Sequence, residues 1–352
     1  MLKTKTDLLW FGGIGTYVRS SDETDADADD RANDSLRVTA EELNAKVVGE
    51  GANLGFTQLA RIEYGLGGGR INTDAIDNSA GVDTSDREVN IKILLGVVED
   101  EGEMTRKQRD RVLAEMTDDV AALVLRDNYL QSQAISLAEI DSPMRLEGDA
   151  RFMRSLERAG LLDRELEFLP DDEVIAERIA ADQGFSRPEF SVLLAYSKMT
   201  LFDELVASDV PEDPYLEADL IRYFPELLRK PYKKQILSHR LRREIIATHV
   251  ANNVVNRAGF TFVTDIVEET GASAANITRG YLIARESFGM RPLWKGIEEL
   301  DNKIPAELQA RMILELMELH RHSTLWFVRN LSKPFEISNV LNDFGPAVQE
   351  LW

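Results

Sequence analysis

Residues 1–95 alternate between continuous apolar runs and apolar positions at helical spacing. The runs cover residues 7–11 and 45–48, and each stops at glycine. Uninterrupted apolar runs of this length are typical of strands buried on both faces of a parallel sheet. Residues 57–64 carry apolar side chains at helical spacing, and Gly65 is a suitable helix stop. The pattern predicts a parallel α/β domain over residues 1–95.

Two small-residue turns interrupt this pattern. The first, residues 49–53, follows a predicted strand and reads GEGAN. The second, residues 77–82, reads DNSAGV and follows residues 71–76, whose alternation predicts another strand. Ser85 and Glu88 then have the spacing of a capping box, which predicts that the next helix begins at Ser85. Turns at the carboxyl ends of parallel strands are where open α/β sheets bind ligands.

After Arg87 the apolar positions recur at helical spacing, and helix caps follow one another. We expect residues 96–352 to form an all-helical domain. Residues 347–352 have the pattern of a helix without a cap. The predicted helices include one capped by Thr105 and Gln108, one from Thr117 to a break at Ser142 and Pro143, one ending at Ala159, and those over residues 186–207, 232–258 and 305–330.

Composition narrows the function classes. The net charge of -21 argues against binding to nucleic acid or to an anionic membrane, since both need positive surface. No apolar run reaches the roughly 18 residues of a membrane span. The absence of cysteine excludes disulfides and thiolate metal sites and favours a cytoplasmic location. His320 and His322 point to different faces of a helix, so we expect no metal site.

Two further segments have competing interpretations. Residues 12–15 read GGIG, which suits either a phosphate cradle or a tight structural turn, and Val18 stands where a full dinucleotide fingerprint needs glycine. Residues 22–30 are rich in aspartate and predict a flexible surface loop. Their alternating aspartates suggest calcium, but the glycine and glutamate of a calcium-binding loop are missing.

The two turns together carry a family resemblance. EGAN at residues 50–53, followed by NSAGV at residues 78–82 and a serine three residues later, resembles the glutamate dehydrogenase family. The longer string GLGGGRINTDAIDNSAGVDTSD is similar to the large NAD-specific bacterial branch of that family. The resemblance extends over roughly residues 7–95, and the turns agree in order and spacing, so it is more specific than a single glycine cluster.

The resemblance implies a fold and a site. Residues 1–95 would be the carboxyl-terminal part of a Rossmann-like NAD-binding domain, and residues 96–352 a large helical domain. The residues implied at the cofactor are Gly12, Gly13, Asn53 and Asn78, and those implied at the substrate are Val82 and Ser85. From the residues alone, Asn53 could merely terminate a strand and Ser85 could merely cap a helix.

The implied reaction is NAD-dependent oxidative deamination of L-glutamate to 2-oxoglutarate and ammonia. It needs a base, which the family supplies from a lysine and an aspartate whose motifs are absent from these residues. We therefore expect a fragment of a longer homo-oligomeric enzyme, inactive alone, with no catalytic residue of its own. The alternative is a helical interaction or regulatory protein that retains a degenerate cofactor domain.

Overall fold

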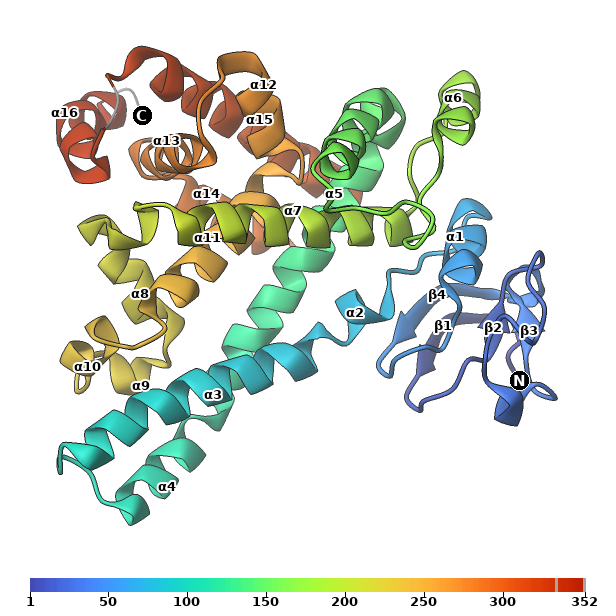
Figure 1. Cartoon of the computed structure of the whole chain (residues 1–352), viewed down its shortest axis with the longest axis horizontal. Coiled ribbons are helices and arrows are strands. Elements are labelled where there is room, and N and C mark those ends of the chain that lie inside the picture. The colour runs from blue at the N-terminus through green and yellow to red at the C-terminus, as the bar shows by residue number, and fades with distance from the viewer. Residues whose placement is uncertain (333–334, 351–352) are drawn as a thin grey trace. The chain divides into compact units, whose positions relative to one another are not determined.

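The first strands of the chain pair in parallel, as the apolar runs predict. In the computed structural model, which describes residues 1–332 and 335–350, β1 (Thr6–Phe11) lies beside β4 (Ala45–Glu50) (Figure 1). Thr6 stands opposite Ala45, and Phe11 stands opposite Glu50. A second parallel pair joins β2 (Val18–Arg19) to β3 (Val38–Thr39). The parallel α/β arrangement is confirmed, and its Rossmann-like character remains a prediction.

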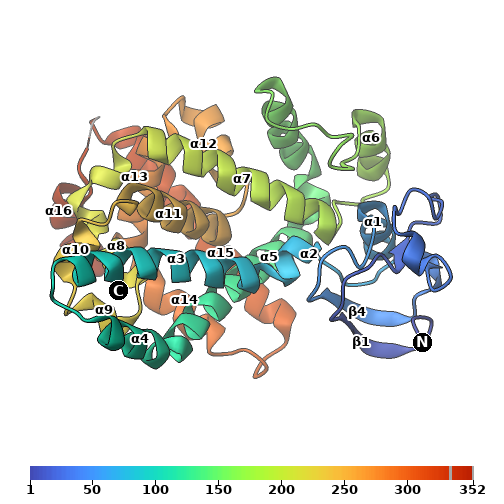
Figure 2. The same cartoon turned by 60° about the horizontal axis from the view of Figure 1, so that its bottom comes forward.

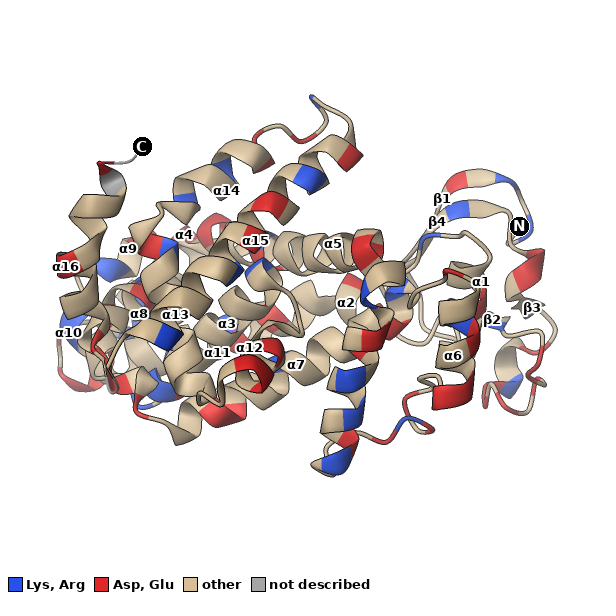
Figure 3. Ribbon diagram, turned by 90° about the horizontal axis from the view of Figure 1, so that it is seen from above, with Lys and Arg blue, Asp and Glu red and all other residues tan. Residues whose placement is uncertain are grey.

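The chain divides into two compact units that are interleaved along the sequence. The first contains Met1–Asp86 and Ala121–Tyr196, and the second contains Arg87–Val120 and Ser197–Trp352. The division into domains after residue 95 remains a prediction. Acidic positions occur along both units (Figure 3), in line with the net charge of -21.

The core of the first unit lies between the strands and α1 (Gln58–Leu66), which Figure 2 shows beside them. The Thr57 hydroxyl caps α1 by accepting from the Ala60 amide at 3.2 Å. Phe56 packs edge-to-face on Phe11 with ring centroids 5.3 Å apart. The Tyr64 hydroxyl donates to the backbone oxygen at the start of β4. The helix predicted over residues 57–64 is confirmed.

One face of the β1–β4 pair differs from the prediction of a strand buried on both sides. Leu8 is 55% exposed and Trp10 is 58% exposed, whereas Phe11 is buried. Alternate residues of a strand point to opposite faces, so only the face toward α1 is covered by core. The Trp10 ring lies over the backbone of Gly49 and Gly51, where a Cβ would come within 2.6 Å of it.

The strand predicted over residues 71–76 is wrong. Pairing with β4 is confined to residue 70, whose oxygen accepts from Val48 at 2.8 Å. The chain then enters α2 (Asp74–Asp77), because the carboxylates of Asp74 and Asp77 bind backbone amides of the preceding turn. The alternation of apolar and polar residues reflects a short helix with Ile76 buried.

The helix predicted to start at Ser85 also begins elsewhere. Helix α3 (Ser79–Asp100) starts directly after Asn78, so Ser85 lies inside it and is not its cap. The Asn128 amide secures this start by donating to the Ser79 hydroxyl at 2.9 Å and to the Ile76 oxygen at 3.2 Å.

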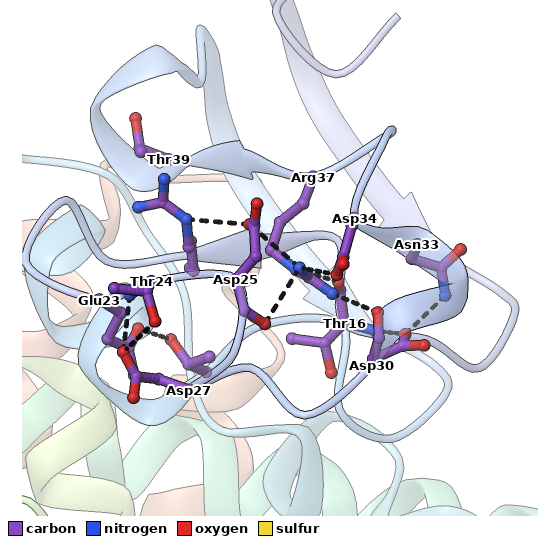
Figure 4. Close-up of polar contacts among 12 residues, drawn as sticks. Thr16, Glu23, Thr24, Asp25, Asp27, Asp30, Asn33, Asp34, Arg37 and Thr39 are labelled. Atoms are coloured by element: carbon purple, nitrogen blue, oxygen red, sulfur yellow. Dashed lines mark hydrogen bonds and ion pairs between the residues drawn. The ribbon is translucent and has the colours of Figure 1, made fainter.

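The aspartate-rich segment is organised by one arginine. The Arg37 side chain is fully buried and bonds the backbone oxygens of Thr16 and Asp30 as well as the carboxylates of Asp25 and Asp34 (Figure 4). These bonds hold the pKa of Asp25 below its ordinary value. Residues 22–30 lie outside helices and strands and are mostly exposed, so the surface-loop prediction is confirmed, while the flexibility of the loop stays a prediction. Among the described residues, no group of acidic side chains and histidines could hold a metal ion.

The other regular elements of the described chain are helices and short 3-10 turns joined by loops. Short 3-10 turns cover Arg31–Asn33, Ala40–Glu42, Val210–Glu212 and Pro214–Leu216. The further helices are α4 (Arg106–Glu115), α5 (Thr117–Arg158), α6 (Asp172–Ala180), α7 (Arg187–Ala207), α8 (Glu217–Tyr223), α9 (Glu226–Arg229), α10 (Lys233–Leu237), α11 (Arg242–Ala258), α12 (Phe262–Thr270), α13 (Ala274–Ser287), α14 (Met290–Glu298), α15 (Ala306–Asn330) and α16 (Ile337–Gln349).

Several helix boundaries agree with the sequence. The capping box of Thr105 and Gln108 is present, with the Thr105 amide donating at 2.8 Å. Helices α7 and α15 start and end within a residue of the predicted positions. The predicted helix over residues 347–352 falls partly in α16, and its last two residues lie outside the described part of the chain.

Two further predicted boundaries are wrong. Helix α5 continues through Ser142 and Pro143, because proline removes one backbone hydrogen bond but does not by itself end a helix. The helix predicted over residues 232–258 is instead two helices, α10 and α11. His239 lies between them and accepts at its Nδ1 from the Leu241 amide at 3.1 Å, which closes a turn.

No helix within residues 1–332 and 335–350 is both long and apolar enough to cross a membrane.

A close backbone contact in the first unit gives a stability prediction. The Phe185 amide donates to the Ser142 hydroxyl at 2.8 Å, and a Cβ on Gly184 would lie 2.8 Å from the Ser142 backbone carbon. We expect Gly184→Ala to lower the free energy of unfolding by about 1–3 kcal/mol, because helix α5 would have to shift. Gly148→Ala, in an uncrowded position of α5, should instead raise it by about 0.5–1 kcal/mol. Urea unfolding of both variants tests this contrast, and an unchanged Gly184→Ala midpoint would contradict it.

A buried histidine in the second unit gives a pH prediction. His320 is fully buried, and its ring stacks on the Tyr281 ring with centroids 4.1 Å apart. Its Nε2 donates to the backbone oxygen of Tyr281 at 2.9 Å. Burial lowers the pKa of His320 to about 4. Its Nδ1 has no hydrogen-bond partner among the described residues, so no acceptor there favours the protonated ring. The unfolded chain therefore binds the proton first, and stability falls as pH drops from about 6.5 to about 4.

The wild-type free energy of unfolding should be lower at pH 4 than at pH 7. We expect His320→Gln to make this difference smaller by roughly 2–3 kcal/mol. His322→Gln, with its exposed side chain, is the matched control and should keep the wild-type pH dependence. Equal pH dependence of the wild type and His320→Gln would show that His320 is not held neutral.

Candidate active site at the ends of β1 and β4

The two asparagines singled out by the turn motifs meet in the folded chain. Asn53 lies in the turn after β4, and Asn78 lies between α2 and α3. The Asn78 side-chain amide donates to the side-chain oxygen of Asn53 at 2.5 Å. An amide has two donors and an acceptor, so the Asn53 NH2 and the Asn78 oxygen can still bind a ligand. The turns are 25 residues apart in sequence and form one polar edge.

The glycines predicted at the cofactor lie at the same edge. Gly12 and Gly13 follow β1 directly, and parallel pairing places the ends of β1 and β4 together. The Ala52 amide donates to the Phe11 oxygen at 3.1 Å, which ties the second turn to the end of β1. Both glycines are exposed, and a Cβ on either would meet no atom within 4 Å. A ligand can therefore approach the backbone here closely.

Two aspartates hold the EGAN turn in place. The Asp77 carboxylate accepts from the Glu50 amide at 2.9 Å, and the Asp74 carboxylate accepts from the Leu54 amide at 2.9 Å. Leu54 adopts a left-handed conformation with φ of 65°, which is uncommon for a residue other than glycine. The position of Asn53, between these two bonds, is fixed from both sides. Sequence reasoning missed both aspartates, although their spacing of three places them on one face of a short helix.

A buried ion pair lies directly beneath the turn. The Glu50 carboxylate is fully buried and accepts from Arg61 through Nε at 2.7 Å and Nη2 at 3.0 Å. It also accepts from the Phe56 amide at 3.2 Å. Burial raises the pKa of Glu50, and the hydrogen bonds of Arg61 oppose that rise. The pair joins the end of β4 to α1. In the sequence, the only sign of this pair is a glutamate at the end of a predicted buried strand.

The residues predicted at the substrate lie on the next helix. Val82 and Ser85 are three residues apart on α3, so they share one face, and both are exposed. Val82 is 65% exposed, as are several other large apolar side chains, so its exposure alone assigns it no role. The positive end of the helix dipole lies at residues 79–81 rather than at Ser85, and the Gly81 amide there donates to the Asn78 backbone oxygen at 3.1 Å.

The arrangement defines a class of site: an open, polar edge where two parallel strands end, built from backbone glycines and paired amides. Comparison with known proteins specifies it further. Residues 1–138 match the family described as "Bacterial NAD-glutamate dehydrogenase, catalytic domain", and residues 182–352 match "Glutamate dehydrogenase, C-terminal". Both matched families are glutamate dehydrogenases, so the resemblance that the two turn motifs predicted is confirmed.

Three relatives show the extent of the similarity. The chain is 50% identical to the NAD-specific glutamate dehydrogenase of Halomonas elongata, 52% identical to that of Pseudomonas aeruginosa and 39% identical to that of Mycobacterium tuberculosis. Each match extends over 351 residues, which is 100% of this chain but only 22% of the relative. The chain therefore spans about a fifth of the length of these relatives.

The buried ion pair beneath the turn gives a stability prediction. We expect Arg61→Met to cost about 3–5 kcal/mol of unfolding free energy, because it leaves the Glu50 carboxylate buried without its partner. Arg70→Met removes an arginine that is 56% exposed and pairs with Glu139, and should change stability by less than about 1 kcal/mol. Urea midpoints measured in parallel check the difference. Similar costs for the two variants would mean that the buried pair does not support the turn.

Proposed function

We propose that this chain forms the nicotinamide and substrate edge of an NAD-dependent glutamate dehydrogenase active site. The observation that carries the proposal is the hydrogen bond between Asn53 and Asn78, which joins the two family turns into one surface. In this proposal residues 1–95 are the carboxyl-terminal part of a Rossmann-like domain, and residues 96–352 form the helical domain. The working enzyme would be a cytoplasmic homo-oligomer of amino-acid catabolism.

The shape of the edge fits a dinucleotide. The exposed backbone at Gly12 and Gly13 has free space where any larger residue would place a side chain, which suits close approach of a planar ring. Asn53 and Asn78 retain a donor and an acceptor, which match the carboxamide and ribose of nicotinamide. Bound NAD would supply the hydride acceptor.

The substrate would lie along the start of α3. Val82 would contact the aliphatic part of L-glutamate, and the Ser85 hydroxyl would donate to its side-chain carboxylate. The positive end of the helix dipole at the start of α3 would add positive potential near that carboxylate. The paired asparagines would bind the nicotinamide, which would accept the hydride from the α-carbon of the substrate.

The remaining chemistry is acid-base. A base removes the proton of the amine, hydride leaves the α-carbon, and water then hydrolyses the resulting imine to 2-oxoglutarate and ammonia. None of the proposed residues is that base. The proposal assigns it to the family's lysine and aspartate, whose motifs these 352 residues do not contain.

The test uses the polypeptide made from the complete reading frame that contains this sequence. We expect Asn53→Ala and Asn78→Ala each to lower kcat/KM for NAD about tenfold or more, since each removes a hydrogen bond worth about 1–2 kcal/mol. Asn44→Ala is the matched control, because Asn44 lies at the opposite end of β4 and bonds the Lys3 oxygen. It should behave as wild type. Glutamate-dependent reduction of NAD gives the rates.

NADH titration separates the proposal from its alternative. Wild-type polypeptide should bind NADH, and the two asparagine variants should bind it more weakly than Asn44→Ala does. If the wild type neither binds NADH nor reduces NAD with glutamate, the enzyme proposal fails, and a helical regulatory protein with a degenerate cofactor domain becomes the better account.

A further inference from the structure

A buried arginine at the start of α7 reaches toward the candidate site. Arg187 is 8% exposed, and its guanidinium donates to Glu139 at 2.9 Å, to the Ser136 hydroxyl at 3.1 Å and to the side-chain oxygen of Asn72 at 3.1 Å. A buried arginine requires such partners, since an unpaired buried charge is costly. Only Glu139 among them carries a charge, so charge pairing does not account for the contact with Asn72.

The contact with Asn72 is the first link of a chain of hydrogen bonds. The Asn72 NH2 donates to one oxygen of Asp77 at 2.8 Å, and the other oxygen of Asp77 accepts from the Glu50 amide at 2.9 Å. Glu50 is the first residue of the EGAN turn. Three consecutive bonds therefore connect Arg187 with the backbone that positions Asn53.

The direction of these bonds is set by Arg187. An arginine can only donate, so the oxygen of Asn72 must face it and the NH2 of Asn72 must face Asp77. An ionised Asp77 accepts at both oxygens, and both are used. Burial raises the pKa of Asp77, while the hydrogen bonds from Asn72 and the Glu50 amide and the charges of Arg187 and Arg61 oppose that rise.

We propose that Arg187 is a positioning residue for the active-site turn, acting through Asn72 and Asp77. The inference rests on the proposed function of that turn. Residue 187 lies in the segment that matches the carboxyl-terminal family, whereas the turn lies in the segment that matches the catalytic domain. The helical segment thus contributes directly to the geometry of the site.

The kinetic test is a double-mutant cycle in the polypeptide made from the complete reading frame. We expect Arg187→Met and Asn72→Ala each to lower kcat/KM for NAD about tenfold to a hundredfold, because small displacements of positioning groups have effects of this size. The double variant should be no worse than the poorer single variant, since both changes break one chain of bonds. Arg187→Lys keeps the charge without the planar fork and should recover only part of the loss.

Arg178→Met is the matched control. Arg178 lies in α6, is similarly buried and forms a two-bond pair with Glu189 of α7, at 2.9 Å for each bond. Its loss should reduce stability, but the folded enzyme should keep kcat/KM within about twofold, and its effect should add to that of Asn72→Ala. Equal kinetics for Arg187→Met and Arg178→Met, or an additive cycle for Arg187 and Asn72, would overturn the proposal and leave the proposed function standing.

Hydrogen exchange provides a readout that does not depend on activity. Arg187→Met should speed amide exchange in a peptide that contains residues 47–56, because the Glu50 amide loses a fixed acceptor. Arg178→Met should leave that peptide unchanged. If exchange there is the same in Arg187→Met and wild type, the positioning role is refuted whether or not the polypeptide oxidises glutamate.

Discussion

The candidate site depends on the bond between the Asp77 carboxylate and the Glu50 amide. A strand that ends at a ligand site leaves its last backbone groups without strand partners, and these must be satisfied elsewhere. Here Asp77 accepts from the Glu50 amide at 2.9 Å, and the Glu50 side chain turns inward to Arg61. The next residues are therefore held in a turn that faces outward, and Asn53 meets Asn78. The exposed polar edge exists because charged groups beneath it are paired.

This arrangement explains why helical and α/β segments share one compact unit. The first unit contains residues 121–196 together with the strands. Asn128 from α5 secures the start of α3, and Arg187 from α7 orients Asn72. Helices from later in the chain thus supply the polar partners that the turns require.

The sequence predicts the elements whose signals are local. Glycine after an apolar run, and caps such as Thr105 with Gln108, depend on near neighbours, and the structure confirms them. Residues 71–76 do not form a strand. The carboxylates of Asp74 and Asp77 instead accept from backbone amides more than 19 residues earlier in the chain, and hydrophobic periodicity carries no information about such contacts. The role of Glu50 is hidden for the same reason. The family resemblance predicts Asn53 and Asn78 as site residues, because both lie in its turn motifs. The hydrogen bond between the two side chains is visible only in the folded chain.

The central claim is that nicotinamide binds at the joined turns. The most direct measurement is an experimental structure of the polypeptide from the complete reading frame with NADH and 2-oxoglutarate. The account predicts nicotinamide against Gly12 and Gly13, its carboxamide or ribose hydrogen-bonded to Asn53 and Asn78, and 2-oxoglutarate beside α3. Nicotinamide bound away from both turns, with the asparagine pair facing solvent, would contradict it.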